Sequence, residues 1–320
     1  MPRHFLSSAD LVPEEQKDLI AAAFDRKERR DERVTSSATQ DLPLRGRSVA
    51  LIFEKASTRT RVSFETAVFE LGGNPIALRR DELQLGRGEP IEDTARVLSG
   101  YVDAIVIRTF GQDRVVRLAS HASVPVINAL TDLEHPCQAL ADVMTVLTHQ
   151  PDPSAVVFSY VGDGNNVAHS LLLAGANAGF GRLTVASPRE FEPERSIVDR
   201  ALQIAGRTGT VVSLTNDPEE ACKGATVIYT DVWASMGQET EQEDKAKAFT
   251  GFQVSEELFS LAHPDSIVMH CLPAHRGEEI AAGVIDGPSS VVWEQAENRL
   301  HTQKALLAWL LSQQDSMRTA

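Results

Sequence analysis

The sequence predicts an α/β protein with two domains, each built from a parallel sheet flanked by helices. Short apolar runs of the kind that form buried strands alternate with longer stretches of helical periodicity along most of the chain. This alternation is typical of parallel sheets covered by helices. The 320 residues are too many for one ordinary core and suit two domains of about 150 residues each.

The first expected elements are a helix and a surface connection. The helix lies near 11–24, with Asp10 as its N-cap candidate and Pro13 in its first turn. Residues 25–41 are charged, then rich in Ser and Thr, without periodicity, which predicts a surface connection. The strands expected beyond it are 49–53, 104–107 and 124–127, followed in the second half by 156–161, 183–186, 211–214, 227–229 and 267–269.

Two helices set the expected domain boundary. A helix over 136–149 ends in a Pro-containing segment and suits a crossing from the first domain to the second. The last helix, beginning near residue 296, suits a return to the first domain. We therefore expect one domain of residues 1–148, with the C-terminal helix 296–320 packing back on it, and a second domain of residues 149–295.

Composition excludes several classes of partner. The net charge of −14 disfavours nucleic acid and anionic membranes, and no apolar stretch approaches the roughly 18 residues of a membrane span. Residues 1–10 lack the features of a secretory signal. Cys137, Cys222 and Cys271 are odd in number and widely spaced, which argues against a disulfide framework and a zinc cluster. We expect a reducing, cytoplasmic setting.

The residues that follow each strand are the candidates for binding, because open parallel sheets bind ligands at the carboxyl ends of their strands. Ser57-Thr58-Arg59-Thr60-Arg61 follows the 49–53 strand and opens a helix. Hydroxyls, guanidinium groups, free N–H groups and the helix dipole together suit a phosphate. The alternative is an ordinary N-cap with solvated arginines. The Gly-Lys-Ser/Thr loop of nucleotide-binding proteins is missing.

Two further strand ends of the first half carry polar side chains. Arg108 follows the 104–107 strand and could join the same anion site, or be a surface arginine. His135 precedes Pro136, which suits the first turn of a helix, so that His135 and Gln138 can point the same way. Imidazole can polarise a carbonyl oxygen, and a Gln amide can bind an amino group. A capping His and a surface Gln are the alternative.

In the second half, the segment Gly162-Asp163-Gly164-Asn165-Asn166 follows the 156–161 strand. It resembles the first turn of a dinucleotide fold, but Val167 stands where the third Gly should be. The two adjacent Asn residues could instead bind a carboxylate. Asp231 follows the 227–229 strand and precedes a Gly-containing loop. Its carboxylate could hold an ammonium group or cap a helix.

The last two candidates follow the 267–269 strand and open the final helix. Cys271 lies beside His270, but adjacent residues of an extended chain point to opposite sides, so their spacing does not make a catalytic dyad. A buried, inert Cys is the commoner outcome. Arg299, near the start of the last helix, could reach back toward a binding site.

Together these segments resemble the aspartate/ornithine carbamoyltransferase superfamily, and within it the ornithine carbamoyltransferases. The matches, in order over nearly the whole chain, are Ser57-Thr58-Arg59-Thr60-Arg61, His135-Pro136-x-Gln138, Gly162-Asp163-Gly164-Asn165-Asn166, Asp231-x-x-x-Ser235-Met236-Gly237, His270-Cys271-Leu272-Pro273 and Glu297-Asn298-Arg299. The first two are shared by carbamoyltransferases in general, whereas the Ser-Met-Gly and His-Cys-Leu-Pro segments point to ornithine. The resemblance implies two Rossmann-like domains, linked by crossing helices, in a trimer or a multiple of trimers.

The resemblance also implies how carbamoyl phosphate binds. The phosphate would be held by Ser57, Thr58, Arg59 and Thr60, with Arg108 bridging phosphate and carbonyl. Thr60 and His135 would face the carbonyl oxygen. The carbamoyl end would meet Gln138, Cys271, Leu272 and Arg299. Gln84 matches a loop residue that reaches the active site of the neighbouring subunit.

For ornithine, the resemblance implies that Asn166 meets the α-carboxylate and that Asp231, with the backbone of Ser235 and Met236, meets the α-ammonium group. Cys271 would orient the attacking δ-amine without forming a covalent bond. The implied catalytic residues are Arg108, His135, Asp231 and Cys271. The implied reaction makes L-citrulline and phosphate in arginine biosynthesis, and it requires no metal or organic cofactor.

Three alternatives remain open at this point. The acceptor could be another amine, such as putrescine or acetylornithine, although Asp231 and the Ser-Met-Gly loop favour a free α-amino acid. The chain could be a non-catalytic binding relative, although the set of Arg59, Arg108, His135, Gln138 and Arg299 is intact. An NAD-dependent dehydrogenase is the third alternative, and a nucleotide-binding titration would test it.

Overall fold

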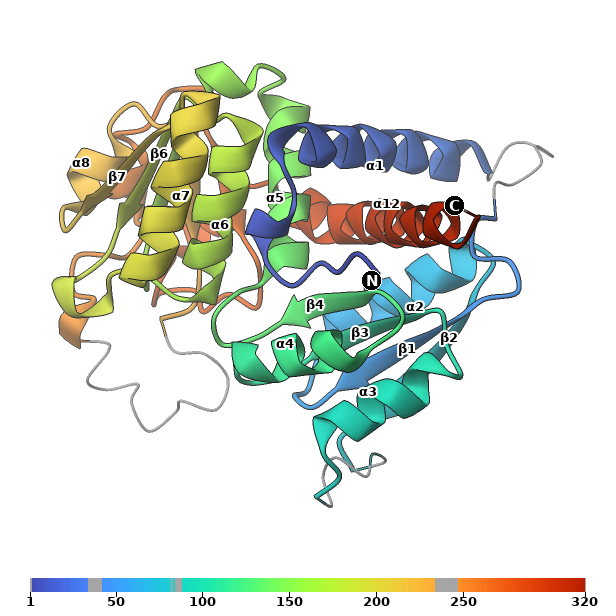
Figure 1. Cartoon of the computed structure of the whole chain (residues 1–320). Coiled ribbons are helices and arrows are strands. Elements are labelled where there is room, and N and C mark those ends of the chain that lie inside the picture. The colour runs from blue at the N-terminus through green and yellow to red at the C-terminus, as the bar shows by residue number, and fades with distance from the viewer. Residues whose placement is uncertain (1, 34–41, 82, 84–87, 234–246, 320) are drawn as a thin grey trace. The chain divides into compact units, whose positions relative to one another are not determined.

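A computed structural model of the chain describes residues 2–33, 42–81, 83, 88–233 and 247–319 (Figure 1). The chain divides into two compact units, Met1–Leu140 with Asn298–Ala320, and Ala141–Glu297. Each unit contains one parallel sheet, of four strands in the first and five in the second. The predicted α/β fold class is therefore confirmed. None of the described helices is both long and apolar enough to cross a lipid bilayer.

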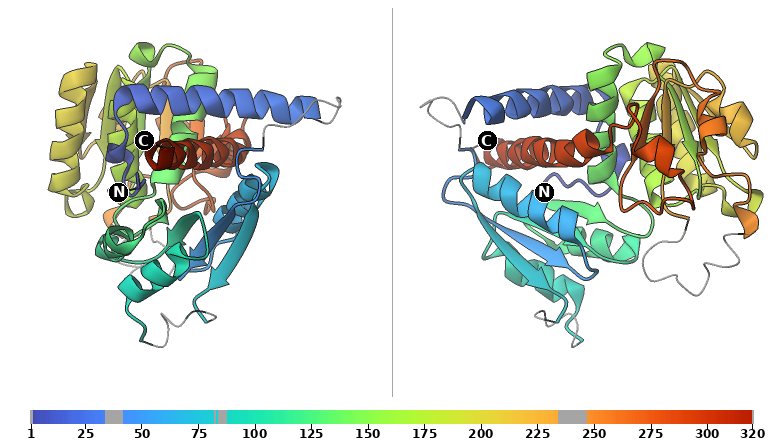
Figure 2. Two further views of the ribbon diagram at one scale, coloured as in Figure 1. Left: turned by 45° about the vertical axis from the view of Figure 1, so that its right-hand side comes forward. Right: turned by 180° about the vertical axis from the view of Figure 1, so that it is seen from behind.

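The sheet of the first unit has the strand order β2-β1-β3-β4. Its strands are β1 (Ser48–Phe53), β2 (Asn74–Arg79), β3 (Ala104–Arg108) and β4 (Val126–Leu130). The helices of this unit are α1 (Pro13–Arg33), α2 (Thr58–Glu70), α3 (Ile91–Ser99), α4 (Gln112–His121) and most of α12 (Val292–Thr319). The central strands are fully buried at Ile52, Ile105 and Ile107, as expected for strands with helices on both faces. Helices α1 and α12 run side by side in every view (Figures 1 and 2).

The sheet of the second unit has the strand order β7-β6-β5-β8-β9. Its strands are β5 (Val157–Val161), β6 (Arg182–Ala186), β7 (Val211–Thr215), β8 (Val227–Thr230) and β9 (Ile267–His270). Its helices are α6 (Asn166–Ala178), α7 (Arg195–Thr208), α8 (Pro218–Cys222), α10 (Glu256–Phe259) and α11 (Ala282–Ile285). The unit boundaries fall within α5 (Pro136–His149) and within α12. In each sheet, the carboxyl ends of the parallel strands lie along the same edge of that sheet. The candidate binding residues come directly after these strand ends.

The first helix differs from its predicted form at both ends. Asp10 does not cap it: the Asp10 carboxylate accepts from the backbone N–H groups of Leu6 and Ser7 at 2.7 and 2.9 Å, inside the capping box of a short 3-10 helix. The helix also runs on to Arg33, through residues that we predicted to be a connection. Strong helix formers fill this stretch, and Asp25 pairs with Arg29 one turn along. The prediction was wrong here because the end of this helix is stabilised by pairs of charged side chains and therefore shows no apolar periodicity.

Two strands also differ from the prediction. Strand β2 was missed because it lies at the sheet edge with a partly exposed, alternating pattern instead of a continuous apolar run. Strand β4 begins at Val126, after Pro125, whereas the predicted strand covered 124–127. Proline lacks an N–H group, so Pro125 contributes only its carbonyl oxygen, which accepts from Ile105 at 2.9 Å, and Val126 is the first paired residue. Helix α2 ends at Glu70, with Leu71 buried and Gly72 at φ +83°.

Candidate active-site residues in the two units

The start of α2 is built for an anion. Ser57 occupies its N-cap position, but the Ser57 side chain makes no capping hydrogen bond. Instead, Nη1 of Arg108, at the end of β3, donates to Ser57 Oγ at 3.3 Å. Thr58 and Arg59 are exposed in the first turn. The first N–H groups of a helix lack intrahelical acceptors and carry partial positive charge, so this helix start and two guanidinium groups favour a phosphate-sized anion.

A buried hydrogen bond ties α12 to the same turn. Nη2 of Arg299 donates to Oγ1 of Thr60 at 2.8 Å, and both residues are almost fully buried, with 4% and 1% of their surface exposed. The two residues are 239 positions apart in the sequence. The structure therefore brings Arg299 to the helix start at which the phosphate motif was predicted.

His135 lies within electrostatic reach of three arginines. It is buried just before α5, and its carbonyl oxygen accepts from the backbone N–H of Gln138, itself buried, at 3.0 Å. Burial and the positive charges of Arg299, Arg108 and Arg59 lower the pKa of His135 well below 6.5. The ring is therefore neutral at neutral pH and can present an N–H group without bringing a fourth positive charge.

Sequence reasoning missed the residue that supports Arg108. Glu54 follows β1, and its carboxylate accepts two hydrogen bonds from Arg114, at 2.8 and 2.7 Å, and a short one from Thr109 Oγ1. The backbone N–H of Glu54 donates to the carbonyl oxygen of Arg108 at 2.9 Å. These contacts join the ends of β1 and β3, so they fix the backbone from which Arg108 extends. A carboxylate directly after a buried strand was the available signal.

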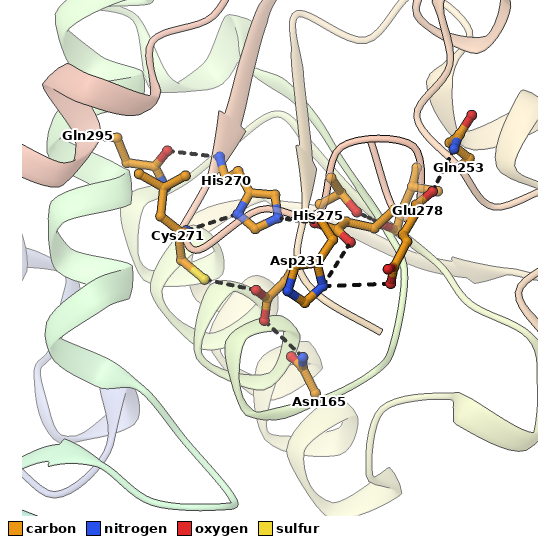
Figure 3. A network of polar contacts seen from close by, with 12 residues as sticks. Asn165, Asp231, Gln253, His270, Cys271, His275, Glu278 and Gln295 are labelled. Atoms are coloured by element: carbon orange, nitrogen blue, oxygen red, sulfur yellow. Dashed lines mark hydrogen bonds and ion pairs between the residues drawn. The ribbon is translucent and has the colours of Figure 1, made fainter. Parts of the chain in front are cut away.

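In the second unit, Asp231 and Cys271 lie together (Figure 3). Asp231 follows β8 and is 5% exposed. Its Oδ1 accepts from the Cys271 thiol at 2.9 Å, and its Oδ2 accepts from Nδ2 of Asn165 at 3.0 Å. Asn165 also caps α6, because its Oδ1 accepts from the backbone N–H groups of Val167 and Ala168. Asn165 therefore holds the Asp231 carboxylate, whereas Asn166 is the first residue of helix α6.

The prediction that His270 and Cys271 point to opposite sides was wrong: a ring nitrogen of His270, the Cys271 sulfur and an Asp231 oxygen lie within 4.8 Å of one another, because strand β9 ends at His270. The His270 ring is buried against Glu279, with Nε2 at 3.1 Å from Oε1. Its Nδ1 accepts from the backbone N–H of Leu272 at 2.9 Å. Since Nδ1 is an acceptor, the ring proton lies on Nε2 and is donated to Glu279. Leu272 has a φ of 59°, an uncommon conformation for a non-glycine residue, and His270 helps to hold it there.

A second buried network holds the other side of β9. Oε1 of Gln295 accepts from the backbone N–H of His270 at 2.9 Å. Nε2 of Gln295 donates to Asp142 at 2.7 Å and to the Tyr229 hydroxyl at 3.1 Å. Sequence reasoning missed Asp142, Glu279 and Gln295. The sequence signal for Glu279 was weak: it directly precedes the apolar residues Ile280 and Ala281.

The predicted site residues therefore form two groups. The first unit holds Ser57, Thr58, Arg59, Thr60, Arg108, His135, Gln138 and Arg299, and the second unit holds Asn166, Asp231, Cys271 and Leu272. Gln84, Ser235 and Met236 lie outside the described residues.

The glycine-containing turn after β5 contacts the protein's own backbone. A Cβ atom on Gly164 would lie 2.3 Å from the backbone nitrogen of Pro193 and 2.5 Å from the carbonyl oxygen of Phe191. The N–H of Gly164 donates to that same oxygen at 2.7 Å. In a dinucleotide fold this kind of turn approaches the pyrophosphate. Here it is used for chain packing, which disfavours the dehydrogenase alternative.

Comparison with known proteins assigns the family. Residues 3–148 match the carbamoyl-P binding domain, and residues 155–310 the Asp/Orn binding domain, of aspartate/ornithine carbamoyltransferase. The chain belongs to this carbamoyltransferase family. The resemblance inferred from the motifs is thereby confirmed.

Individual carbamoyltransferases match over almost their full length. An ornithine carbamoyltransferase of Parafrankia sp. (strain EAN1pec) is 57% identical over 97% of this chain and 96% of its own. That of Acidothermus cellulolyticus is 56% identical over 97% of both chains. Among solved structures, the ornithine carbamoyltransferase of Pyrococcus furiosus superposes with a TM-score of 0.91 at 50% identity, covering 96% of each chain. The anabolic ornithine carbamoyltransferase of Campylobacter jejuni gives a TM-score of 0.90 at 38% identity, covering 97% of this chain and 99% of that one.

Proposed function

We propose that the protein transfers the carbamoyl group of carbamoyl phosphate to the δ-amine of L-ornithine, which gives L-citrulline and phosphate. The observation that carries the proposal is that each unit gathers side chains suited to one of the two substrates. The first unit offers a helix start with arginines for a phosphate, and the second offers a carboxylate beside a thiol for an amino acid. The relatives named ornithine carbamoyltransferase, at 57% and 56% identity, support this acceptor.

We assign carbamoyl phosphate to the first domain, residues 1–148 with the helix 296–320. Ser57, Thr58, Arg59 and the N–H groups of α2 bind the phosphate, and Arg108 bridges the phosphate and the carbonyl oxygen. Thr60 and His135 face that oxygen, and the hydrogen bond from Arg299 orients the Thr60 hydroxyl. Gln138, Leu272 and Arg299 face the carbamoyl end of the substrate.

We assign ornithine to the second domain, residues 149–295. Asp231 binds the α-ammonium group, together with the backbone of Ser235 and Met236, and Asn166 binds the α-carboxylate. Because the Cys271 thiol already donates to Asp231, its sulfur is held in place beside the substrate. There it orients the δ-amine as a weak hydrogen-bond partner. Cys271 forms no covalent bond with the substrate.

The chemistry then balances without a cofactor. The neutral δ-amine attacks the carbamoyl carbon, forming a C–N bond and placing negative charge on the carbonyl oxygen. Arg108, neutral His135 and Thr60 stabilise that charge by hydrogen bonding. The carbonyl re-forms as the C–O bond to the phosphate breaks, the phosphate leaves with the electron pair, and the nitrogen gives up one proton, which the departing phosphate takes. Positioning the two substrates for attack supplies much of the rate.

The proposal is tested by following phosphate release from carbamoyl phosphate with ornithine, putrescine, acetylornithine or aspartate. Ornithine is expected to give the highest kcat/KM, and Arg108→Ala is expected to lower it by about 10²–10³-fold, as for one lost oxyanion donor. Arg96→Ala is the matched control, because Arg96 is an exposed arginine that pairs with the exposed Asp93. A preference for putrescine or aspartate, or unchanged turnover by Arg108→Ala, would contradict the proposal.

We also propose that the protein assembles as a trimer, or a multiple of trimers, in the cytoplasm and serves arginine biosynthesis. In the family resemblance, Gln84 reaches the active site of a neighbouring subunit. Mixed assemblies of Gln84→Ala and His135→Ala chains should then regain activity that neither variant has alone. An active monomer on sedimentation would refute the shared site. The free thiols of Cys137, Cys222 and Cys271 suit a reducing compartment.

A further inference from the structure

The turn that follows Cys271 and Leu272 is held rigidly from two sides. Within it, the N–H of Gly277 donates to the carbonyl oxygen of Ile280 at 2.8 Å, and the N–H of Glu278 donates to that of His275 at 3.0 Å. From outside, Nε2 of Gln253 donates to the carbonyl oxygens of Gly277 and Glu278, both at 2.7 Å (Figure 3). Side chains on this turn are therefore presented from a fixed backbone.

Three metal-ligating side chains converge on this turn. Nδ1 of His275 lies 3.6 Å from Oε2 of Glu278 and 4.0 Å from Oε2 of Glu279, and the three ligand atoms lie within 4.8 Å of one another. These separations are too long for hydrogen bonds. Bonds of 2.0–2.2 Å to a tetrahedral ion place neighbouring ligand atoms roughly 3.3–3.6 Å apart. An ion at the centre would need the two carboxylates to move inward by only a few tenths of an ångström.

Glu279 supplies the observation that points to a ligand. Its side chain is fully buried, and its Oε1 accepts from the His270 ring at 3.1 Å and from the backbone N–H of His275 at 2.6 Å. Its Oε2, which faces the His275 ring, has no hydrogen-bond partner among the described residues. A buried acceptor without a donor is destabilising, and more so when it is charged. A cation at this position removes that destabilisation.

The arginine of the same turn does not neutralise the Glu279 carboxylate. Arg276 donates two hydrogen bonds to Asp286, at 2.8 and 2.7 Å, so its charge is directed to another carboxylate. The His275 and Glu278 side chains are 46% and 50% exposed, so an ion can reach the turn from water and keep a water molecule as a fourth ligand.

We propose that His275, Glu278 and Glu279 form a binding site for a divalent transition-metal ion, with Zn²⁺ as the representative. One imidazole and two carboxylates suit Zn²⁺ better than Mg²⁺ or Ca²⁺, which prefer sites made of oxygen alone. Two carboxylates balance the charge of the ion while the imidazole binds in its neutral form. The site adjoins the group of Asp231, His270 and Cys271, because Oε1 of Glu279 accepts from the His270 ring, but its ligand atoms are different.

Titration calorimetry of the full-length protein with Zn²⁺ tests the site. A Cys271→Ser background removes the thiol as a competing ligand. In that background, one Zn²⁺ per chain is expected, and His275→Ala or Glu278→Gln should weaken binding by about tenfold or more. The matched controls are His263→Ala and Glu257→Gln, which change exposed residues of the same unit and should leave the affinity unchanged. Both site residues are exposed, so their replacement does not threaten the fold.

Metal identity provides a second readout. Co²⁺ bound in the same background should show visible d–d bands of a low-symmetry nitrogen and oxygen site, and His275→Ala should abolish them. Loss of stoichiometric Zn²⁺ binding in the Cys271→Ser background overturns the proposal, as do site variants that bind as well as the controls. Equal affinity for Mg²⁺ or Ca²⁺ overturns the assignment to a transition metal.

Discussion

The buried ion pair between α2 and α12 makes a quantitative prediction. Glu70 accepts from Lys304 Nζ at 2.8 Å and from Arg30 Nε at 3.0 Å. The Glu70 and Lys304 side chains are only 4% and 8% exposed. Glu70→Ala would leave the ammonium group of Lys304 buried without its partner. Removing one member of a buried pair costs about 3–5 kcal/mol, because the remaining charge stays desolvated.

Hydrogen exchange measured by mass spectrometry tests this prediction, because it reports the stability of individual segments. A global unfolding curve of a chain with two units does not resolve such a local loss. A loss of 3 kcal/mol corresponds to a decrease of about 100-fold or more in protection, at roughly 1.4 kcal/mol for each factor of ten. The decrease should appear in peptides of α2 and of α12 beyond residue 298, whereas the sheet of the second unit should keep its protection.

Two further variants make the test selective. Asp25→Ala breaks an exposed i,i+4 pair, with side chains 52% and 64% exposed, and should cost about 0.3–0.5 kcal/mol. Glu70→Met with Lys304→Met replaces the pair by apolar groups and should recover most of the loss. If Glu70→Ala costs no more than Asp25→Ala, or if the double variant is worse than Glu70→Ala alone, the reasoning from a buried unpaired charge is wrong.

Three other predictions concern titration and reactivity. Burial alone would raise the pKa of Glu70, but the hydrogen bonds from Lys304 and Arg30 outweigh it and hold that pKa below 4.5. The stabilisation by this ion pair is therefore complete above pH 4.5 and is lost as the pH falls through the lowered folded-state pKa. Glu70→Gln should flatten the acid limb of a series of urea-unfolding curves measured at different pH. Burial and three arginines lower the pKa of His135 well below 6.5, so the unfolded chain takes up a proton at pH 6 that the folded chain does not; a cationic His135 ring in ¹⁵N spectra at that pH would refute this. Burial raises the pKa of Cys137 and Cys222 to about 12, whereas Cys271 is partly exposed. Iodoacetamide should therefore label Cys271 first in the folded protein. Uniform labelling of the three cysteines in peptide maps would contradict this prediction.

Much of the fold could be predicted because its central strands are continuous apolar runs, and their ends carry the binding residues. The exceptions share a physical cause. Strand β2 is half exposed, and the end of α1 is stabilised by charge pairs such as Asp25–Arg29, so neither has the apolar pattern on which the prediction rests. Strand β2 depends on its pairing with β1, whereas the end of α1 depends on helix propensity and i,i+4 charge pairs.

The candidate site divides in the same way. Ser57, Arg108 and Asp231 could be found because they follow strands, and a parallel sheet gathers its strand ends. The contact between Arg299 and Thr60 spans 239 positions, and no local pattern encodes it. The partners of His270, which are Glu279 and Gln295, are buried polar residues whose sequence neighbours reveal nothing about which groups they will satisfy.

The turn at Gly164 shows what glycine spacing measures. Its amide meets a carbonyl oxygen of the same chain, and a side chain at this position would collide with the 191–193 backbone. A glycine pattern after a strand thus indicates that another group packs closely against the main chain. The pattern does not distinguish a cofactor from another loop of the protein. Enzymes that bind no nucleotide can keep much of a nucleotide fingerprint for this reason. Even a methyl group at residue 164 would force this backbone to shift, directly beside Asn165, which holds Asp231.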